Sequence, residues 1–150
     1  CGISYEGIAW TTGAAVMAGG QMPDKRSLLL ALLYSVGTHG IMTLNDFKAV
    51  QGDRQMCVRS LPVQLGVQSA AGVACWFMGL PQVVVIILLF AWGCPSQALA
   101  VTVLLGIQLL MMDYFLTRVV QRALWYSGFG VPFFVAGMMV SAFALRGLIS

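Results

Sequence analysis

The stretch that decides the fold is residues 68–92, QSAAGVACWFMGLPQVVVIILLFAW, which holds no charged side chain. A helix needs about 20 mostly apolar residues to cross a bilayer, so this stretch predicts a membrane-spanning helix. Pro81 lies in its middle and predicts a kink or a split there. Over all 150 residues, 59% are hydrophobic and only 9% are charged. This composition excludes a water-soluble globule and an intrinsically disordered chain.

Four further apolar stretches predict membrane spans of the same kind. They cover residues 1–18, 27–44, 97–116 and 128–145, and a basic linker over 118–122 precedes the last one. We therefore expect an all-α fold, in which residues 1–150 form one polytopic membrane helix bundle with about five transmembrane helices. The eight lysines and arginines are spread along this apolar chain. They form no basic patch, so nucleic acid is not an expected partner.

The distribution of basic residues predicts the orientation of the bundle. Five of the eight lie in the segments after the second and fourth spans, and the other side has three. Cytoplasmic loops are enriched in lysine and arginine. We therefore expect residues 46–61 to form a cytoplasmic Asp-rich loop.

Polar chemistry is concentrated in residues 43–63, TLNDFKAVQGDRQMCVRSLPV. Asp46 and Asp53 are seven residues apart, so a helix that continued past the membrane edge would carry both carboxylates on one face. Their axial separation would be about 10 Å. This is too far for one ion, but it suits two Mg²⁺ ions bridged by a diphosphate. A solvated loop with surface charges would explain the same spacing.

Neighbouring side chains suit the same ligand. Asn45 can add a neutral oxygen, and the cationic side chains of Lys48 and Arg54 can hold the remaining phosphate charge. Arg59 is a third cation in this segment.

Two titratable residues within the predicted spans are candidates for function. His39 is seven residues before Asp46 and would extend the same stripe. It could contact a polar substrate or ligate a chlorin magnesium, or it could line a pore or bond a neighbouring helix. Asp113 is a functional candidate as an intramembrane acid, or a partner of Arg118 or Arg122.

The run HGIMTLNDFK at 39–48, followed by GDR at 52–54 and RSLPV at 59–63, resembles the second Asp-rich motif of the bacteriochlorophyll synthases. These enzymes belong to the UbiA superfamily of intramembrane prenyltransferases. The stretches SYEG at 4–7 and WYSG at 125–128 are also similar, and the resemblance covers the whole chain. It implies the carboxy-terminal half of a nine-helix fold. Cys57 stands where the family usually has glycine.

The resemblance implies a specific reaction. Such enzymes esterify the propionate of bacteriochlorophyllide with geranylgeranyl or phytyl diphosphate, with Mg²⁺ as cofactor. In a bacterial inner, photosynthetic membrane, Asp46 and Asp53 would be the catalytic metal ligands, and Asn45, Lys48 and Arg54 would bind diphosphate. His39 would be a possible tetrapyrrole contact. The expected partners, besides the two substrates, are membrane lipid and possible other photosynthetic membrane proteins.

The first Asp-rich motif belongs to the earlier half of the family's chains, and nothing in this sequence supplies it. The chain is therefore expected to be inactive alone. It is either a fragment of a full synthase or a half-length homologue that has lost catalysis. In the second case it would be an accessory pigment- or lipid-binding subunit of a photosynthetic membrane complex. A transporter is a weaker alternative, because paired broken helices are not indicated.

Overall fold

The computed structural model describes residues 24–149, with side chains described over residues 24–145. Its helices are α2 (Lys25–Gln55), α3 (Leu61–Leu65), α4 (Val67–Ala91), α5 (Pro95–Leu116) and α6 (Val119–Ile149). No strand occurs between residues 24 and 149. The predicted all-α fold is confirmed, while the predicted first span at 1–18 lies outside the described residues.

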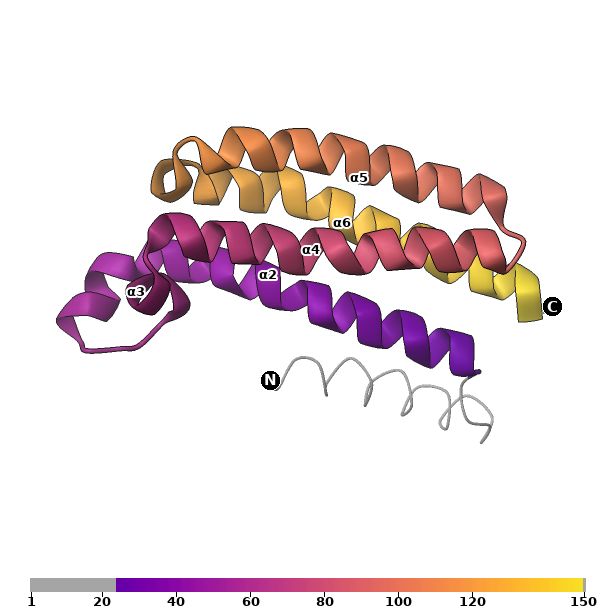
Figure 1. Ribbon diagram of the computed structural model, residues 1–150, viewed down its shortest axis with the longest axis horizontal. Helices are drawn as coiled ribbons and strands as arrows, with labels where there is room; N and C mark the ends of the chain where they lie inside the picture. The colour runs from indigo at the N-terminus through magenta and orange to yellow at the C-terminus, as the bar shows by residue number, and fades with distance from the viewer. Residues whose placement is uncertain (1–23, 150) are drawn as a thin grey trace.

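Four of these helices are long and apolar enough to cross a membrane. Figure 1 shows them running lengthwise together, with α4 between α2 and α5. Both α2 and α5 pack against α4 and α6, which closes a four-helix ring, and α4 also touches α6. The predicted membrane helix bundle is therefore confirmed. Its core lies inside this ring, where Leu44, Met78, Val101 and Tyr126 are buried.

The second span is longer than the hydropathy predicts. The prediction ended it at residue 44, whereas α2 continues to Gln55. The expected loop over 46–61 is thus wrong for its first ten residues, which are helical. The cause is packing: Phe47 and Val50 lie on the buried face of α2, and the Phe47 and Phe115 ring centroids are 6.1 Å apart.

The last span also begins earlier than predicted. The basic linker expected over 118–122 is mostly helical, because α6 begins at Val119. Val119, Ala123 and Tyr126 are buried at helical spacing, and the Tyr126 ring stacks on Phe115 with centroids 5.1 Å apart. Buried contacts thus extend this helix into a segment that its charge marks as a linker.

Pro81 does not split the third span. It lies inside α4, which is one helix from Val67 to Ala91. Pro81 is buried in the bundle. In membrane helices, neighbouring helices and side chains can compensate for the backbone hydrogen bond that proline removes.

Small residues bring α2 close to α4. A Cβ added at Gly40 would lie 2.4 Å from the carbonyl oxygen of Ala74. Glycine is therefore needed at this point of contact, because any side chain would push the two helices apart. This contact fixes α2, the helix that carries both candidate aspartates, against the rest of the bundle.

The polar end of α2 and the turn between α5 and α6 lie at the same end of the bundle (Figure 1). The basic-residue pattern predicts this shared side. α3 lies beside the end of α2 and packs against both α2 and α4. The cytoplasmic orientation of this end stays a prediction.

Candidate functional site

The candidate site is the polar end of α2, residues 45–55. α2 has 31 residues. At a rise of 1.5 Å per residue it is about 46 Å long, which exceeds a hydrocarbon core of about 30 Å. The apolar stretch of this helix ends at Leu44. Its last three turns therefore extend beyond the membrane-spanning part and carry polar chemistry at the membrane edge.

Asp46 and Asp53 lie on one face of this unbroken helix, two turns apart, and both side chains are half-buried. Partial burial raises the pKa of the Asp46 carboxyl above its usual value, and the charge of Asp53 raises it further. The two carboxylates thus interact electrostatically. A cation placed near them would relieve this repulsion.

The cationic side chains of the segment are exposed. Lys48 donates a hydrogen bond from Nζ to Asn45 Oδ1 at 3.3 Å, and Arg54 lies in the last turn of α2. Within residues 24–145, no ion pair joins Asp46 or Asp53 to these cations or to Arg59. The charges that the sequence brings together therefore do not neutralise one another.

A left-handed residue ends α2 next to Asp53. Cys57 has a φ of 56°, and the Val58 N–H donates to the Asp53 carbonyl at 2.8 Å while the Met56 N–H donates to the Gly52 carbonyl at 2.9 Å. The Val58–Asp53 bond is the six-to-one bond of a Schellman motif, whose left-handed position normally holds glycine. Cys57 occupies that position here.

The short helix α3 holds the last part of the motif. Pro62 is buried in its first turn, and the Arg59 carbonyl accepts a hydrogen bond from Gln64 Nε2 at 2.5 Å. Residues 59–63 are thereby kept beside the end of α2.

His39 lies on the same stripe of α2 as Asp46, two turns earlier, and is half-buried. Its ring centroid is 6.1 Å from that of Phe77 on α4, and its carbonyl accepts a hydrogen bond from Thr43 Oγ1 at 2.9 Å. The imidazole is therefore at the α2–α4 junction, and its contact with a tetrapyrrole stays a prediction.

The donor set fits Mg²⁺ only together with a phosphate ligand. No group of three or more His, Cys, Asp or Glu side chains that could hold a metal occurs in the described part of the chain. Mg²⁺ usually takes one or two carboxylates and fills its remaining positions with phosphate oxygens and water. Asp46 and Asp53 match this mode because each offers one hard carboxylate next to cations that suit phosphate.

The structure does not pair Asp113 with either arginine that the sequence offers. Arg122 instead donates to the Tyr114 carbonyl at 2.6 Å and to the Thr117 hydroxyl. Its guanidinium lies 3.6 Å from the centroid of the Tyr114 ring. Asp113 forms no ion pair with Arg118 either within residues 24–145, so of the two alternatives for Asp113 the structure does not support the arginine partner.

Sequence reasoning missed one contact that braces this end of the bundle. Gln68 Nε2, in the first turn of α4, donates to the Leu116 carbonyl at the end of α5 with a length of 3.0 Å. Helix ends leave carbonyls without partners, and this side chain satisfies one of them. The one signal for this hydrogen bond in the sequence is a polar residue, Gln68, at the start of an apolar stretch.

Comparison with known proteins gives relatives of one kind. The chain is 52% identical over 146 residues to the bacteriochlorophyll synthase 33 kDa chain of Cereibacter sphaeroides, covering 97% of this chain and 48% of that protein. It is 41% identical over 143 residues to the 34 kDa chain of Chloroflexus aurantiacus, covering 95% and 45%. The chloroplastic chlorophyll synthase of Arabidopsis thaliana is 37% identical over 144 residues, covering 95% and 36%.

The resemblance to bacteriochlorophyll synthase is thus confirmed over nearly the whole chain. The chain spans about half the length of the bacterial relatives it matches, which is consistent with a carboxy-terminal half. No family model matches the chain, and no solved structure matches it.

Proposed function

We propose that this chain is the carboxy-terminal half of a membrane prenyltransferase of the bacteriochlorophyll synthase type. In this proposal the polar end of α2 binds the diphosphate of a geranylgeranyl or phytyl substrate. The observation that carries it is the pair of half-buried carboxylates, Asp46 and Asp53, on one face of a helix that extends past its apolar part. The synthase relatives support the same class of reaction.

Each residue of the site has a defined task in the proposal. Asp46 and Asp53 would each hold one Mg²⁺ ion, which when bound neutralises charge on the diphosphate. Lys48 and Arg54 would bind the remaining phosphate oxygens, and Asn45 would orient them. The carbon–oxygen bond of the prenyl diphosphate breaks, and its electron pair leaves with the diphosphate. The propionate carboxylate of bacteriochlorophyllide then forms the new ester bond at the allylic carbon.

His39 would contact the tetrapyrrole in this arrangement. It lies about 10 Å along α2 from Asp46, on the membrane side of the carboxylates. A macrocycle seated there would be held in the apolar part of the bundle while its propionate reached the polar end. The bacterial photosynthetic membrane, with the polar end of α2 in the cytoplasm, is the setting that we propose.

The alternative is a homologue without catalysis that binds pigment or lipid as an accessory subunit of a photosynthetic membrane complex. The two candidates differ in whether the polar end of α2 binds a prenyl diphosphate in a Mg²⁺-dependent manner.

The test uses the chain in two forms. One is the chain alone, and the other is a full-length protein in which it replaces the matching half of the Cereibacter sphaeroides relative. With Mg²⁺, geranylgeranyl diphosphate and bacteriochlorophyllide, we expect ester from the full-length form and none from the chain alone. Orientation contributes about 7–11 kcal/mol to reactions of this kind, and half of a cavity cannot supply it. Ester formation by the chain alone, or a full-length form that folds but is inactive, would contradict the proposal.

A further inference from the structure

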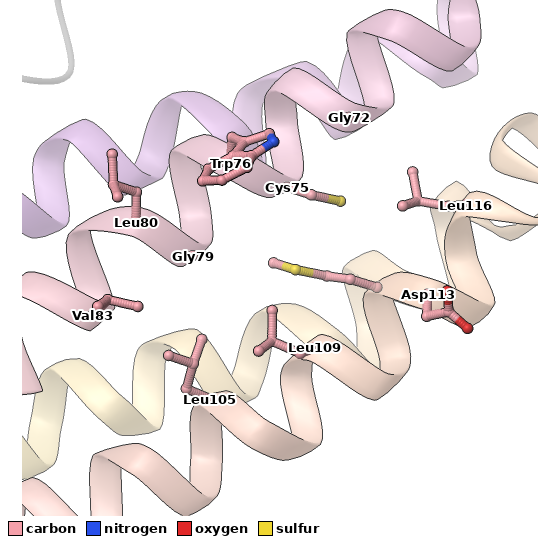
Figure 2. A pocket seen from close by; sticks show the side chains of 11 residues that line it. Gly72, Cys75, Trp76, Gly79, Leu80, Val83, Leu105, Leu109, Asp113 and Leu116 are labelled. Carbon is pink, nitrogen blue, oxygen red and sulfur yellow. The ribbon is translucent and has the colours of Figure 1, made fainter.

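A hollow outside the candidate site lies between α4 and α5. Its volume is about 370 Å³, and its lining is almost entirely apolar. Two glycines of α4, Gly72 and Gly79, make room for it, because no heavy atom lies within 4 Å of a Cβ added at either one. Figure 2 shows Gly72 and Leu116 at one end of the hollow and Val83 and Leu105 towards the other. We name this hollow the α4–α5 groove.

The length of the groove matches one leaflet of a bilayer. From Gly72 to Val83 the groove follows α4 for about 16 Å, which is half of a hydrocarbon core of about 30 Å. It begins near the first turn of α4 and the last turn of α5, which lie at the same end of the bundle as the polar end of α2. A transmembrane helix needs contact along the whole core, whereas one acyl chain of one leaflet needs only this depth.

The headgroup end of the groove carries one negative charge. Asp113 is exposed there, three residues before the end of α5. Arg122 donates its hydrogen bonds to the Tyr114 carbonyl and the Thr117 hydroxyl, so it does not neutralise this carboxylate. An acidic side chain at the membrane edge is costly unless it is paired or hydrated. Its charge repels phosphate-terminated ligands and attracts an ammonium group.

We propose that the α4–α5 groove binds one phospholipid of the leaflet at this end, with an acyl chain along α4 from Gly72 to Val83 and a primary ammonium headgroup at Asp113. A primary ammonium donates hydrogen bonds to a carboxylate, whereas the methyl groups of choline prevent them. The groove is separate from the polar end of α2, and its charge disfavours a prenyl diphosphate. The inference therefore stands apart from the proposed function.

Trp76 provides a direct reporter of occupancy. It lines the groove and is 72% exposed. Replacement of the other three tryptophans, Trp10, Trp92 and Trp125, by phenylalanine leaves Trp76 as the single tryptophan. The full chain is placed in phosphatidylcholine vesicles that contain increasing amounts of a lipid with brominated acyl chains. We expect brominated phosphatidylethanolamine to quench Trp76 at about one third of the concentration that brominated phosphatidylcholine requires. A preference of about threefold is what an exposed ion pair typically contributes.

Variants separate the headgroup contact from the apolar groove. Asp113→Asn should abolish the preference for phosphatidylethanolamine. Gly79→Leu should fill the groove and remove the preferential quenching. Gly72→Leu fills the other end and is made in parallel, with helical content by circular dichroism showing which variants fold. The matched control is Gly106→Leu, since Gly106 also has open space around it but does not line the groove.

Each outcome decides the proposal. Equal quenching by the two brominated lipids, stronger quenching by brominated phosphatidylglycerol, or an unchanged preference in Asp113→Asn would overturn it. An equal loss in Gly106→Leu and Gly79→Leu would do the same. Displacement of the brominated lipid by geranylgeranyl diphosphate would assign the groove to a prenyl chain, which overturns the lipid site and leaves the proposed function standing.

Discussion

Compared with the interior of the helix ring, the last turns of α2 hold their polar side chains in a different way. Inside the ring, Gln82 Nε2 donates to Gln108 Oε1 at 2.8 Å, and the Tyr34 and Ser141 hydroxyls are 2.9 Å apart. These side chains are neutral, buried and bonded between helices. At the end of α2, Asp46 and Asp53 are charged and half-buried, and no cation of the described chain pairs with them.

The difference follows from the two environments. A neutral polar group in an apolar interior is costly when it lacks a partner. The bond between Gln82 and Gln108 satisfies one atom of each amide, while Gln82 Oε1 and Gln108 Nε2 have no partner among the described residues. Charged groups at the membrane edge can remain without protein partners because water reaches them. Asp46 and Asp53 are therefore suited to an external ligand, whereas Gln82 and Gln108 are suited to hold helices together.

The sharpest test of this difference replaces the aspartates. In the full-length form, Asp46→Asn and Asp53→Asn should each lower prenyl transfer by at least about a hundredfold, because charge on the departing diphosphate is no longer balanced. The thermal unfolding midpoint should barely change. Asp24→Asn, an exposed aspartate at the opposite end of the same helix, is the matched control for activity. Full activity in either site variant would end the assignment.

Substitutions inside the helix ring should change the free energy of unfolding rather than the binding of a ligand. Gln82→Leu leaves the Gln108 Oε1 without its donor, so we expect a loss of about 1–3 kcal/mol in the free energy of unfolding. The double variant Gln82→Leu with Gln108→Leu should recover much of that loss, since both polar partners are then replaced by apolar groups. Reversible unfolding in detergent measures both. A double variant as unstable as the sum of the two single variants would contradict a structural role for the pair.

A smaller effect is expected at the end of α2. Cys57→Gly should stabilise the chain by about 1 kcal/mol, because a side chain in the left-handed region strains the backbone and glycine does not. Thermal unfolding of the wild type and this variant measures the gain. Cys57→Ala keeps a Cβ and is the control, which should show no such gain.

The smallest effect concerns the titration of Asp46. Asp53→Asn removes one of the two causes that raise its pKa, so the midpoint should move to lower pH while the part due to burial remains. Because the folded-state pKa is raised, ionising Asp46 opposes folding, and this residue favours the folded state more as the pH falls through that pKa. Carboxyl carbon NMR against pH reports the midpoint. A midpoint that does not move in Asp53→Asn would show that the carboxylates do not interact.

Hydropathy predicts the four long helices within the described residues, but not the short α3 and not all of the helix ends. The apolar stretch from 68 to 92 corresponds closely to α4, because no charge interrupts it. The ends of α2 and the start of α6 were missed because buried residues such as Phe47 and Tyr126 extend these helices through charged sequence. Such packing depends on neighbouring helices that no local pattern contains.

The candidate site was predictable only in part, because local spacing places residues on one helix but not against a neighbouring helix. A spacing of seven between Asp46 and Asp53 is enough to predict a shared helix face once the helix continues. The α4–α5 groove was missed, although Gly72 and Gly79 share this spacing of seven. Glycine spacing shows which face of a helix lacks side chains. A hollow forms on that face only because α5 lies beside it.

The close contact of Gly40 with Ala74 also sets how far the two carboxylates would move if the packing of α2 on α4 were changed. Asp46 and Asp53 lie about 9 Å and about 20 Å along the same helix from that point. A tilt of about 5° at the contact would therefore move Asp46 by about 0.8 Å and Asp53 by about 1.7 Å. Since a misplacement of about 1 Å can cost a hundredfold in rate, the position of Asp53 is the more sensitive of the two to a side chain added at Gly40.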